Sequence, residues 1–468
     1  MFRRTYLKYL KMKIDVEISA PRTAQFANVL LCYQDGAEQK RVKLALPDFE
    51  SLFDFTKDTS SIAFDFLLIS AITYGIDDLI TRKKWSFNGW TRELQVSFPV
   101  QHLNQWQAVS VQMSNALGFL TGDLWEVSFH KLETSPLYKQ RANRRKSRIP
   151  KYDHTKHDFV SLFSGGLDSL IGVIDSLDQV ADGKKGLLVS HFDSAYSGPK
   201  IDQDQIIRVF KTHFANKFTH IRSRVGLKKT DVNDDKIQRD TNQRSRSILF
   251  MGLGVYLLHH VPQTNELLIP ENGTISLNHP LTPSRSSSLS TRTTHPYFMQ
   301  SLERILNTVG LNVKLHNPFG FATKGQMVAS CKHQIALQDT FAKSASCGKR
   351  GHKVSWNIRN ARQCGVCMPC IYRRAALHKN GWDNETYGSD LLAISDPRTA
   401  PKDIKALFDF LKTALTLKDI TRNLLVNGSL EHDKLDQYAQ VVHNSRAEIL
   451  AWIAAKGNDD LKGYLGLQ

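Results

Sequence analysis

The chain has 468 residues, of which 41% are hydrophobic and 23% are charged, and this composition is typical of a folded globular protein. It contains no apolar run long enough to span a membrane, and its basic opening segment lacks the apolar core of a secretory signal. We therefore expect a cytoplasmic protein with no membrane partner, and length alone predicts about three domains. The net charge of +17 predicts anionic partners such as nucleotides, nucleic acid or an acidic protein.

Residues 1–137 predict an N-terminal α+β module. Strand-like segments at 93–100 and 123–132 flank a helical segment at 105–120, and residues 65–80 predict a further helix. No catalytic group of residues is recognisable in this part of the chain. We therefore assign it to the presentation of a partner or a substrate.

A basic linker follows at residues 138–157. Its first part, residues 138–151, contains seven lysines and arginines and no acidic residue. Such a block of like charge is most often a solvated linker. The alternative is a positively charged surface that binds RNA or an acidic protein.

Residues 158–345 predict an α/β domain built on a doubly wound parallel sheet, because apolar segments typical of strands alternate with helical segments. The predicted strands are 158–163, 185–192, 218–225 and 266–270, and the predicted helices are 170–177, 201–214 and 244–261. Ligands of such a sheet bind at the carboxyl ends of its strands. Gly252 and Gly254 lie inside the last predicted helix and indicate close packing rather than a cofactor loop.

A polar turn separates the first of these strands from the first helix. It reads SGGLDS, and its residues are Ser164, Gly165, Gly166, Leu167, Asp168 and Ser169. Glycines at the start of a helix let an anion approach free backbone N–H groups, so the turn predicts a phosphate site. No lysine follows Gly166, which excludes a Walker A loop, and adjacent glycines exclude the dinucleotide fingerprint. The alternative is a glycine-rich turn in which Asp168 only caps the helix.

Four of the six cysteines lie within 24 residues in the segment 346–380, and these are Cys347, Cys364, Cys367 and Cys370. Two C-x-x-C steps and a distant fourth thiol are the pattern of a structural tetrathiolate site. All-sulfur ligands favour Zn²⁺ or an iron–sulfur cluster, and we expect Zn²⁺. Residues 381–468 predict a helical packing or interface region, with a break at Asn427 and Gly428.

The SGGLDS turn resembles the pyrophosphate-binding loop (PP-loop) of the N-type ATP pyrophosphatases. These enzymes split ATP between its α and β phosphates to adenylate an oxygen of the substrate. A helix that starts at Arg246, the segment NPFGFATKGQM around Lys324 and the terminal cysteines extend the likeness, and residues 158–377 resemble the 7-cyano-7-deazaguanine synthase family. Members of that family adenylate 7-carboxy-7-deazaguanine, add ammonia to give an amide and dehydrate the amide to a nitrile.

The chain departs from this family at two positions and in its added segments. Ser247 stands where the family usually has asparagine, and Gln326 stands where it usually has glutamate. The N-terminal module, the C-terminal helices and a loop at 269–296 rich in Ser, Thr and Arg resemble additions in synthase-like proteins of the Qat anti-phage defence systems. That resemblance implies a protein partner from the same system, whose amine takes the place of ammonia.

The resemblance implies ATP, Mg²⁺ and Zn²⁺ as cofactors, and it implies roles for three charged residues. Asp168 would bind Mg²⁺ facing the phosphates, while Arg246 and Lys324 would neutralise the charge that develops on them. For Arg246, a surface salt bridge is the competing interpretation. We accordingly predict an ATP-dependent ligase that forms a carbon–nitrogen bond.

Substrate contacts are predicted after the fourth strand. A deazaguanine base presents two N–H groups side by side, which one carboxylate can accept, and Glu271 is the candidate. The candidates for the substrate carboxylate are Arg285, Arg292 and His295. The alternatives are that Glu271 is an exposed loop acid and that the loop is a lid.

Two other functions remain open at this point. The first is an RNA-modifying enzyme of the same fold that adenylates a tRNA base, which needs a nucleic acid partner that we do not favour. Thiolating enzymes of that kind require a reactive cysteine near the loop, and a tetrathiolate site would occupy the candidates. The second is a non-catalytic nucleotide sensor, against which the retained Asp168 and Lys324 argue.

Overall fold

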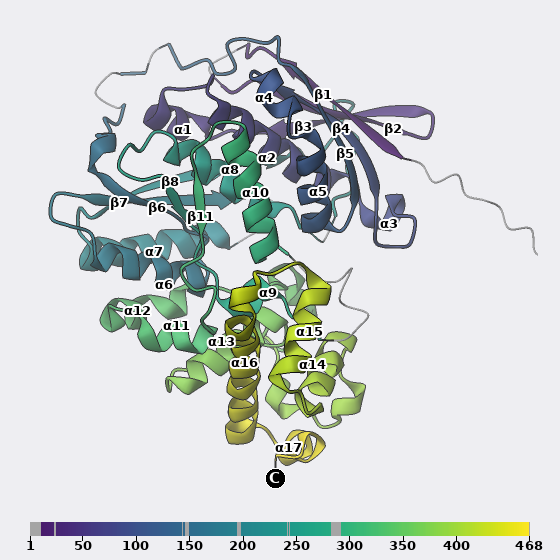
Figure 1. Ribbon diagram of the computed structural model, residues 1–468, viewed down its shortest axis with the longest axis vertical. Coiled ribbons are helices and arrows are strands. Elements are labelled where there is room, and N and C mark those ends of the chain that lie inside the picture. The colour runs from purple at the N-terminus through teal and green to yellow at the C-terminus, as the bar shows by residue number, and fades with distance from the viewer. Residues whose placement is uncertain are drawn as a thin grey trace, which may run out of the picture.

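The computed structural model describes residues 11–22, 25–142, 144–145, 149–193, 198–240, 242, 244–281 and 292–467. Two sheets with their helices form the upper part of the molecule as drawn in Figure 1, and a helical region forms the lower part. Among the described residues, we find no helix with the length and hydropathy that a bilayer crossing requires.

The central sheet has five parallel strands in the order β11-β10-β6-β7-β8, so the predicted parallel α/β sheet is confirmed. Its strands are β6 (His157–Leu162), β7 (Lys185–Phe192), β8 (Phe218–Arg224), β10 (Glu266–Leu268) and β11 (Lys314–His316). The chain adds strands on one side of β6 and then, from β10, on the other. The carboxyl ends of β6 and β10 therefore flank the switch point, where open α/β sheets bind ligands.

Helices cover both faces of the central sheet, which explains why its strands read as continuous apolar runs. The connecting helices are α6 (Leu167–Asp178), α7 (Pro199–His213), α8 (Arg246–Leu258) and α10 (Pro296–Thr308). Along β7, Leu187 and Val189 pack in the core that contains α8, whereas Leu188 packs in the core that contains α6 and α7.

A mixed six-stranded sheet in the order β5-β4-β1-β2-β3-β9 forms the N-terminal region. Its strands are β1 (Met12–Ser19), β2 (Asn28–Asp35), β3 (Glu38–Ala45), β4 (Glu93–Val100), β5 (Leu124–Lys131) and β9 (Gly226–Leu227). Only Val225 separates β9 from β8, so one stretch of chain passes from the central sheet into this second sheet. Its helices are α1 (Phe49–Thr56), α2 (Ile62–Leu79), α3 (Arg82–Trp85), α4 (Leu103–Gln107) and α5 (Ser110–Thr121).

Helix α2 joins the two sheets into one hydrophobic core. Every residue of α2 from the second to the last is buried, and the helix packs against α8. A Cβ atom on Gly252 would lie 2.6 Å from Ser70 of α2, and one on Gly254 would lie 2.7 Å from Leu267. The prediction that both glycines serve packing is confirmed.

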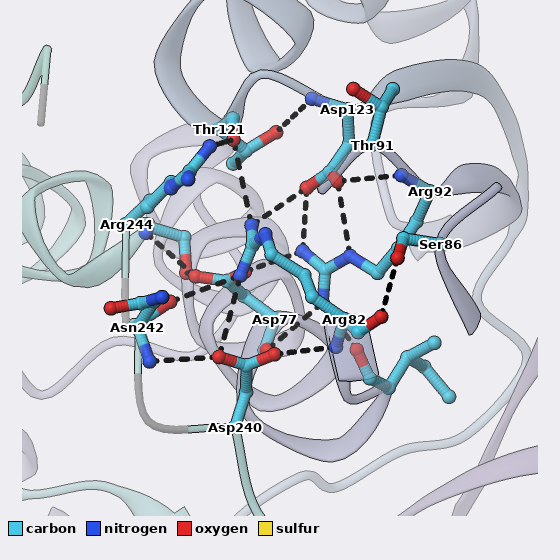
Figure 2. Close-up of polar contacts among 12 residues, drawn as sticks. Asp77, Arg82, Ser86, Thr91, Arg92, Thr121, Asp123, Asp240, Asn242 and Arg244 are labelled. Carbon is cyan, nitrogen blue, oxygen red and sulfur yellow. Dashed lines mark hydrogen bonds and ion pairs between the residues drawn. The ribbon is translucent and has the colours of Figure 1, made fainter. Parts of the chain in front are cut away.

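Three aspartates and three arginines are buried together where α2 ends (Figure 2). They are Asp77, Arg82, Arg92, Asp123, Asp240 and Arg244. Arg92 Nη2 lies 2.6 Å from Asp77 Oδ1 and 2.5 Å from Asp123 Oδ2. Asp77 Oδ2 also accepts hydrogen bonds from the backbone N–H and the hydroxyl of Ser245, each at 2.9 Å. Because α8 begins at the next residue, this network fixes the start of α8 on the N-terminal region.

The start of the predicted basic linker is fastened to α1. The Tyr138 ring packs at a tilt against Phe49 and Phe53, with ring centroids 5.3 and 4.8 Å apart, and the Arg144 guanidinium donates hydrogen bonds to both carboxylate oxygens of Asp54 at 2.7 and 2.6 Å. Residues 143 and 146–148 of this segment lie outside the described residues.

The C-terminal part is helical, as predicted, and α15 ends at the expected Asn427. The remaining helices are α9 (Gly273–Leu277), α11 (Lys324–Ser330), α12 (Gln334–Thr340), α13 (Met368–Lys379), α14 (Lys402–Lys412), α15 (Leu417–Asn427), α16 (Leu435–Lys456) and α17 (Asp459–Leu465). The long helix α16 packs against α9, α11 and α13, so the C-terminal region reaches the switch point of the central sheet.

Candidate phosphate site and four-cysteine centre

The first three residues of the predicted phosphate loop form a tight turn between β6 and α6, and the last three form the first turn of α6 itself. Gly165 has a φ of +84°, and a Cβ atom there would lie 3.3 Å from Gln203, so glycine fits this position best. The Ser164 hydroxyl accepts a hydrogen bond from Gly166 N–H at 3.2 Å and lies 3.0 Å from the Ser169 hydroxyl. The loop is thus held in shape at the N-terminus of a helix of 12 residues.

A charged cluster lies directly beside this loop. Lys324, the first residue of α11, forms an ion pair with Asp168, and the two side chains are only 3% and 9% exposed. Asn272 donates from Nδ2 to Asp168 Oδ2 at 2.8 Å and to Glu271 Oε1 at 3.3 Å. These residues follow β6, β10 and β11, so the central sheet brings together at its switch point groups that are far apart in sequence.

The two carboxyl groups of the cluster have opposite pKa shifts. Burial favours the neutral form of Asp168, but the Lys324 charge and the hydrogen bonds from Glu271, Lys324 and Asn272 outweigh it and hold its pKa below 3.8. Burial raises the pKa of Glu271 well above 4.5, and the neighbouring Asp168 charge raises it further. The cluster therefore favours the ionised form of Asp168 and the protonated form of Glu271.

We expect Glu271→Gln to raise the free energy of unfolding near neutral pH. When the pKa of a carboxyl rises on folding, the free energy of unfolding falls as the pH increases from the unfolded pKa, near 4.5, through the folded pKa. The amide has no such loss. Urea unfolding measured between about pH 4 and pH 8 should show that the free energy of unfolding of the variant increases relative to that of the wild type as the pH rises. Parallel stability curves would contradict this assignment.

The start of α11, which carries Lys324, is held from two sides. Thr323 and Gln326 form a reciprocal capping box, so Gln326 has a structural role at the start of the helix. From α16, the Glu448 carboxylate accepts hydrogen bonds from the Thr323 hydroxyl at 2.6 Å, from Gly325 N–H at 3.3 Å and from Lys379 Nζ at 3.1 Å. The sequence offered no signal for Glu448, because its partners lie in segments far along the chain.

We expect Glu448→Ala to lower the free energy of unfolding by about 1–3 kcal/mol, since it leaves two buried donors, the Thr323 hydroxyl and Gly325 N–H, without their acceptor. Urea unfolding measures this loss. The matched control is Glu431→Ala, which removes a half-exposed ion pair with Lys434 and should cost less than about 1 kcal/mol. Equal effects of the two substitutions would show that Glu448 does not support α11.

Arg246 lies beyond the end of β7 rather than against Asp168. Burial, reinforced by the Arg246 charge, lowers the pKa of His191 to about 3, and the Arg246 guanidinium lies 5.6 Å from the Phe250 ring. At the same edge, Asp193 accepts a hydrogen bond from Tyr74 of α2 at 3.1 Å. The N-terminal region thus contributes side chains to this edge, which sequence reasoning missed.

Of the predicted substrate-binding residues that the structure describes, only Glu271 lies beside Asp168 and Lys324. Arg285 lies outside the described residues. Arg292 lies over the Phe119 ring at 4.5 Å, and burial lowers its pKa. His295 caps α10 by accepting from Tyr297 N–H at 3.2 Å, and burial, reinforced by the Arg292 charge, lowers its pKa to about 3. His295 is therefore neutral, and it offers no cation for a substrate carboxylate.

The four predicted cysteines converge. Their Sγ atoms all lie within 4.8 Å of one another, and those of Cys364 and Cys370 are 3.8 Å apart. Sulfur atoms around Zn²⁺ are about 3.8 Å apart when each Zn–S bond is about 2.3 Å, so the arrangement fits a tetrathiolate ion. Backbone N–H groups of Cys364 and Cys367 point at neighbouring sulfur atoms at 3.3 Å, as expected around thiolate ligands. Within the described residues, no other group of this kind could hold a metal.

The geometry defines an α/β protein with a glycine turn at a helix N-terminus, a buried lysine–carboxylate cluster and a four-cysteine cluster that could hold a metal ion. Comparison with known proteins adds no family to this description: no protein-family model, curated protein or solved structure matches the chain. What the protein does must therefore be argued from these residues.

Proposed function

We propose that the protein is an ATP-dependent, carboxylate-adenylating ligase of the PP-loop ATP pyrophosphatase class. The observation that supports this most is the pairing of Asp168 with Lys324, two residues selected from separate motifs, beside the glycine turn at the switch point. Ion pairs also form in purely structural sites, but this one lies at the N-terminus of a helix, where anions bind.

Backbone and side-chain groups of the protein would bind the phosphates of ATP and neutralise their charge. The backbone N–H groups of Gly165 and Gly166 and the hydroxyls of Ser164 and Ser169 hold the leaving pyrophosphate. The Lys324 ammonium neutralises the charge that develops on it. Arg246, at the same edge of the central sheet but near the end of β7, also neutralises charge on the phosphates.

Asp168 and Glu271 fit a Mg²⁺ ion, because Mg²⁺ takes one or two carboxylates together with phosphate oxygens. When bound, this ion supplies positive charge to the phosphates. In this proposal Glu271 binds the Mg²⁺ ion rather than the deazaguanine base. Its carboxyl faces Asp168 and would exchange its proton for the metal.

The proposed reaction has two balanced steps. A carboxylate oxygen of the substrate attacks the α-phosphorus of ATP, and pyrophosphate leaves. A nitrogen nucleophile then attacks the acyl carbon, AMP leaves and an amide forms. By the motif resemblance, the substrate is a 7-carboxy-7-deazaguanine, and the nitrogen is ammonia or an amine on a partner protein of an anti-phage defence system.

An RNA acceptor is the second candidate, because residues 340–382 contain nine lysines and arginines and no acidic residue. Five of these cations are engaged within the chain, however. Arg350 and Arg362 bind Asp202, while the other three are Arg373 with Glu385, Arg374 with Asp383, and Lys379 with Glu448. Much of the positive charge is thus internal, which favours the protein acceptor.

The test is to mix the purified chain with ATP, Mg²⁺ and 7-carboxy-7-deazaguanine, with and without ammonia, and to follow AMP, pyrophosphate and the mass of the deazaguanine. AMP release that depends on the substrate supports the proposal. AMP release that requires RNA instead would show that the acceptor is a nucleic acid.

A further inference from the structure

The segment just before the first cysteine ligand runs along the phosphate loop. The backbone N–H of Ala345 donates to the carbonyl of Gly165 at 3.1 Å. The backbone N–H of Leu167, the first residue of α6, donates to the hydroxyl of Ser346 at 3.5 Å. A side chain from outside the loop therefore contacts one of the N–H groups that the start of α6 offers to an anion.

Ser346 is tied in turn to the four-cysteine centre. It immediately precedes Cys347, and its own N–H donates to Gln363 Oε1 at 2.9 Å. Gln363 is only 2% exposed and immediately precedes Cys364. The residues before two of the ligands thus bind each other, so the position of the Ser346 hydroxyl depends on the geometry of the centre.

We propose that Ser346 is a further pyrophosphate-binding residue, held in place by the four-cysteine centre. A serine hydroxyl can accept and donate at once, so while it accepts from Leu167 its own proton is available to a phosphate oxygen at the start of α6. The four-cysteine centre thereby acts as a positioning element of the phosphate site. This inference rests on the proposed function, since it names another group that holds the same leaving group.

The first test measures pyrophosphate affinity by calorimetry on the full-length protein. Ser346→Ala should weaken binding about tenfold, the typical effect of losing one hydrogen bond to a charged group. Ser346→Thr, which keeps the hydroxyl, should restore most of the affinity. The control is Ser355→Ala. Ser355 is an exposed serine between Cys347 and Cys364, and its hydroxyl donates to His352 O at 2.8 Å. Metal content, determined by mass spectrometry, should be equal in all variants.

The second test follows hydrogen–deuterium exchange in the peptide that contains residues 164–169, without ligand. Ser346→Ala and chelation of the metal should both speed exchange at this loop, whereas Ser355→Ala should not. Unchanged exchange and unchanged pyrophosphate affinity in Ser346→Ala would overturn the inference, whatever chelation does to the fold. If the wild-type protein binds no pyrophosphate, the proposed function fails, and with it the binding role of Ser346. The exchange data then show only whether Ser346 supports the loop.

Discussion

Replacing Lys324 with methionine should reduce substrate-dependent pyrophosphate release by about 100-fold to 1000-fold, the usual cost of removing one group that stabilises developing charge. Methionine has nearly the same length and volume, so the substitution removes the charge and little else. Lys324 is the cation nearest the loop, through its ion pair with Asp168, and no water screens a side chain that is 3% exposed. Release of AMP and pyrophosphate under substrate saturation measures the effect.

The control for this experiment is Lys332→Met, which removes an exposed lysine just beyond α11. It should leave the rate unchanged. Circular dichroism verifies that both variants are folded. A Lys324→Met enzyme with a rate within a factor of about two of the wild type would eliminate Lys324 from the chemistry, and with it the main support for the proposed function.

Arg92→Met should lower the free energy of unfolding by about 3–5 kcal/mol, because it removes one of the two arginines paired with the buried carboxylates of Asp77 and Asp123 and leaves Arg82 alone to neutralise both. Arg92, Asp77 and Asp123 all have fully buried side chains. Burial favours the neutral form of Asp77, yet Arg92 and Arg82 hold its pKa at about 2. Without Arg92 that pKa must rise toward its unfolded value, so Asp77 costs the variant less stability on acidification, and the difference between variant and wild type should narrow as the pH falls.

Urea unfolding at neutral pH and at about pH 3, inside the range in which Asp77 titrates, measures both effects. The matched control is Lys13→Met in the same six-stranded sheet, where the pair with Asp15 is 68% and 56% exposed and should contribute less than about 1 kcal/mol. If Arg92→Met unfolds no more easily than this control, then the buried network does not join the N-terminal region to the start of α8.

The sequence predicts the central sheet well for a physical reason. Strands buried on both faces must be apolar throughout, so β7 coincides with its predicted segment, and β8 ends one residue before the end of its own. The segment 105–120 was less predictable: it is divided into α4 and α5 around Ala108 and Val109, because a local break in a helix leaves no change in the apolar period.

Within the candidate site, the residues found from sequence are those that belong to a local motif. The glycine turn, Asp168, Lys324 and the cysteines each carry such a pattern. Asn272 and Glu448 carry none, since their role comes from contacts that only the folded sheet and α16 create. Pattern alone also missed the ion pair of Arg144 in the basic linker, because its acidic partner Asp54 lies in the remote helix α1.

Helix α2, buried along nearly its whole length, has a consequence for synthesis of the chain. Its apolar surface emerges from the ribosome long before α8, which covers one side of it. Until then the nascent N-terminal sheet carries an uncovered hydrophobic helix, a state prone to aggregation. A fragment that stops before residue 246 should therefore depend on chaperones for solubility, and the N-terminal region should mature only after the central sheet has been made.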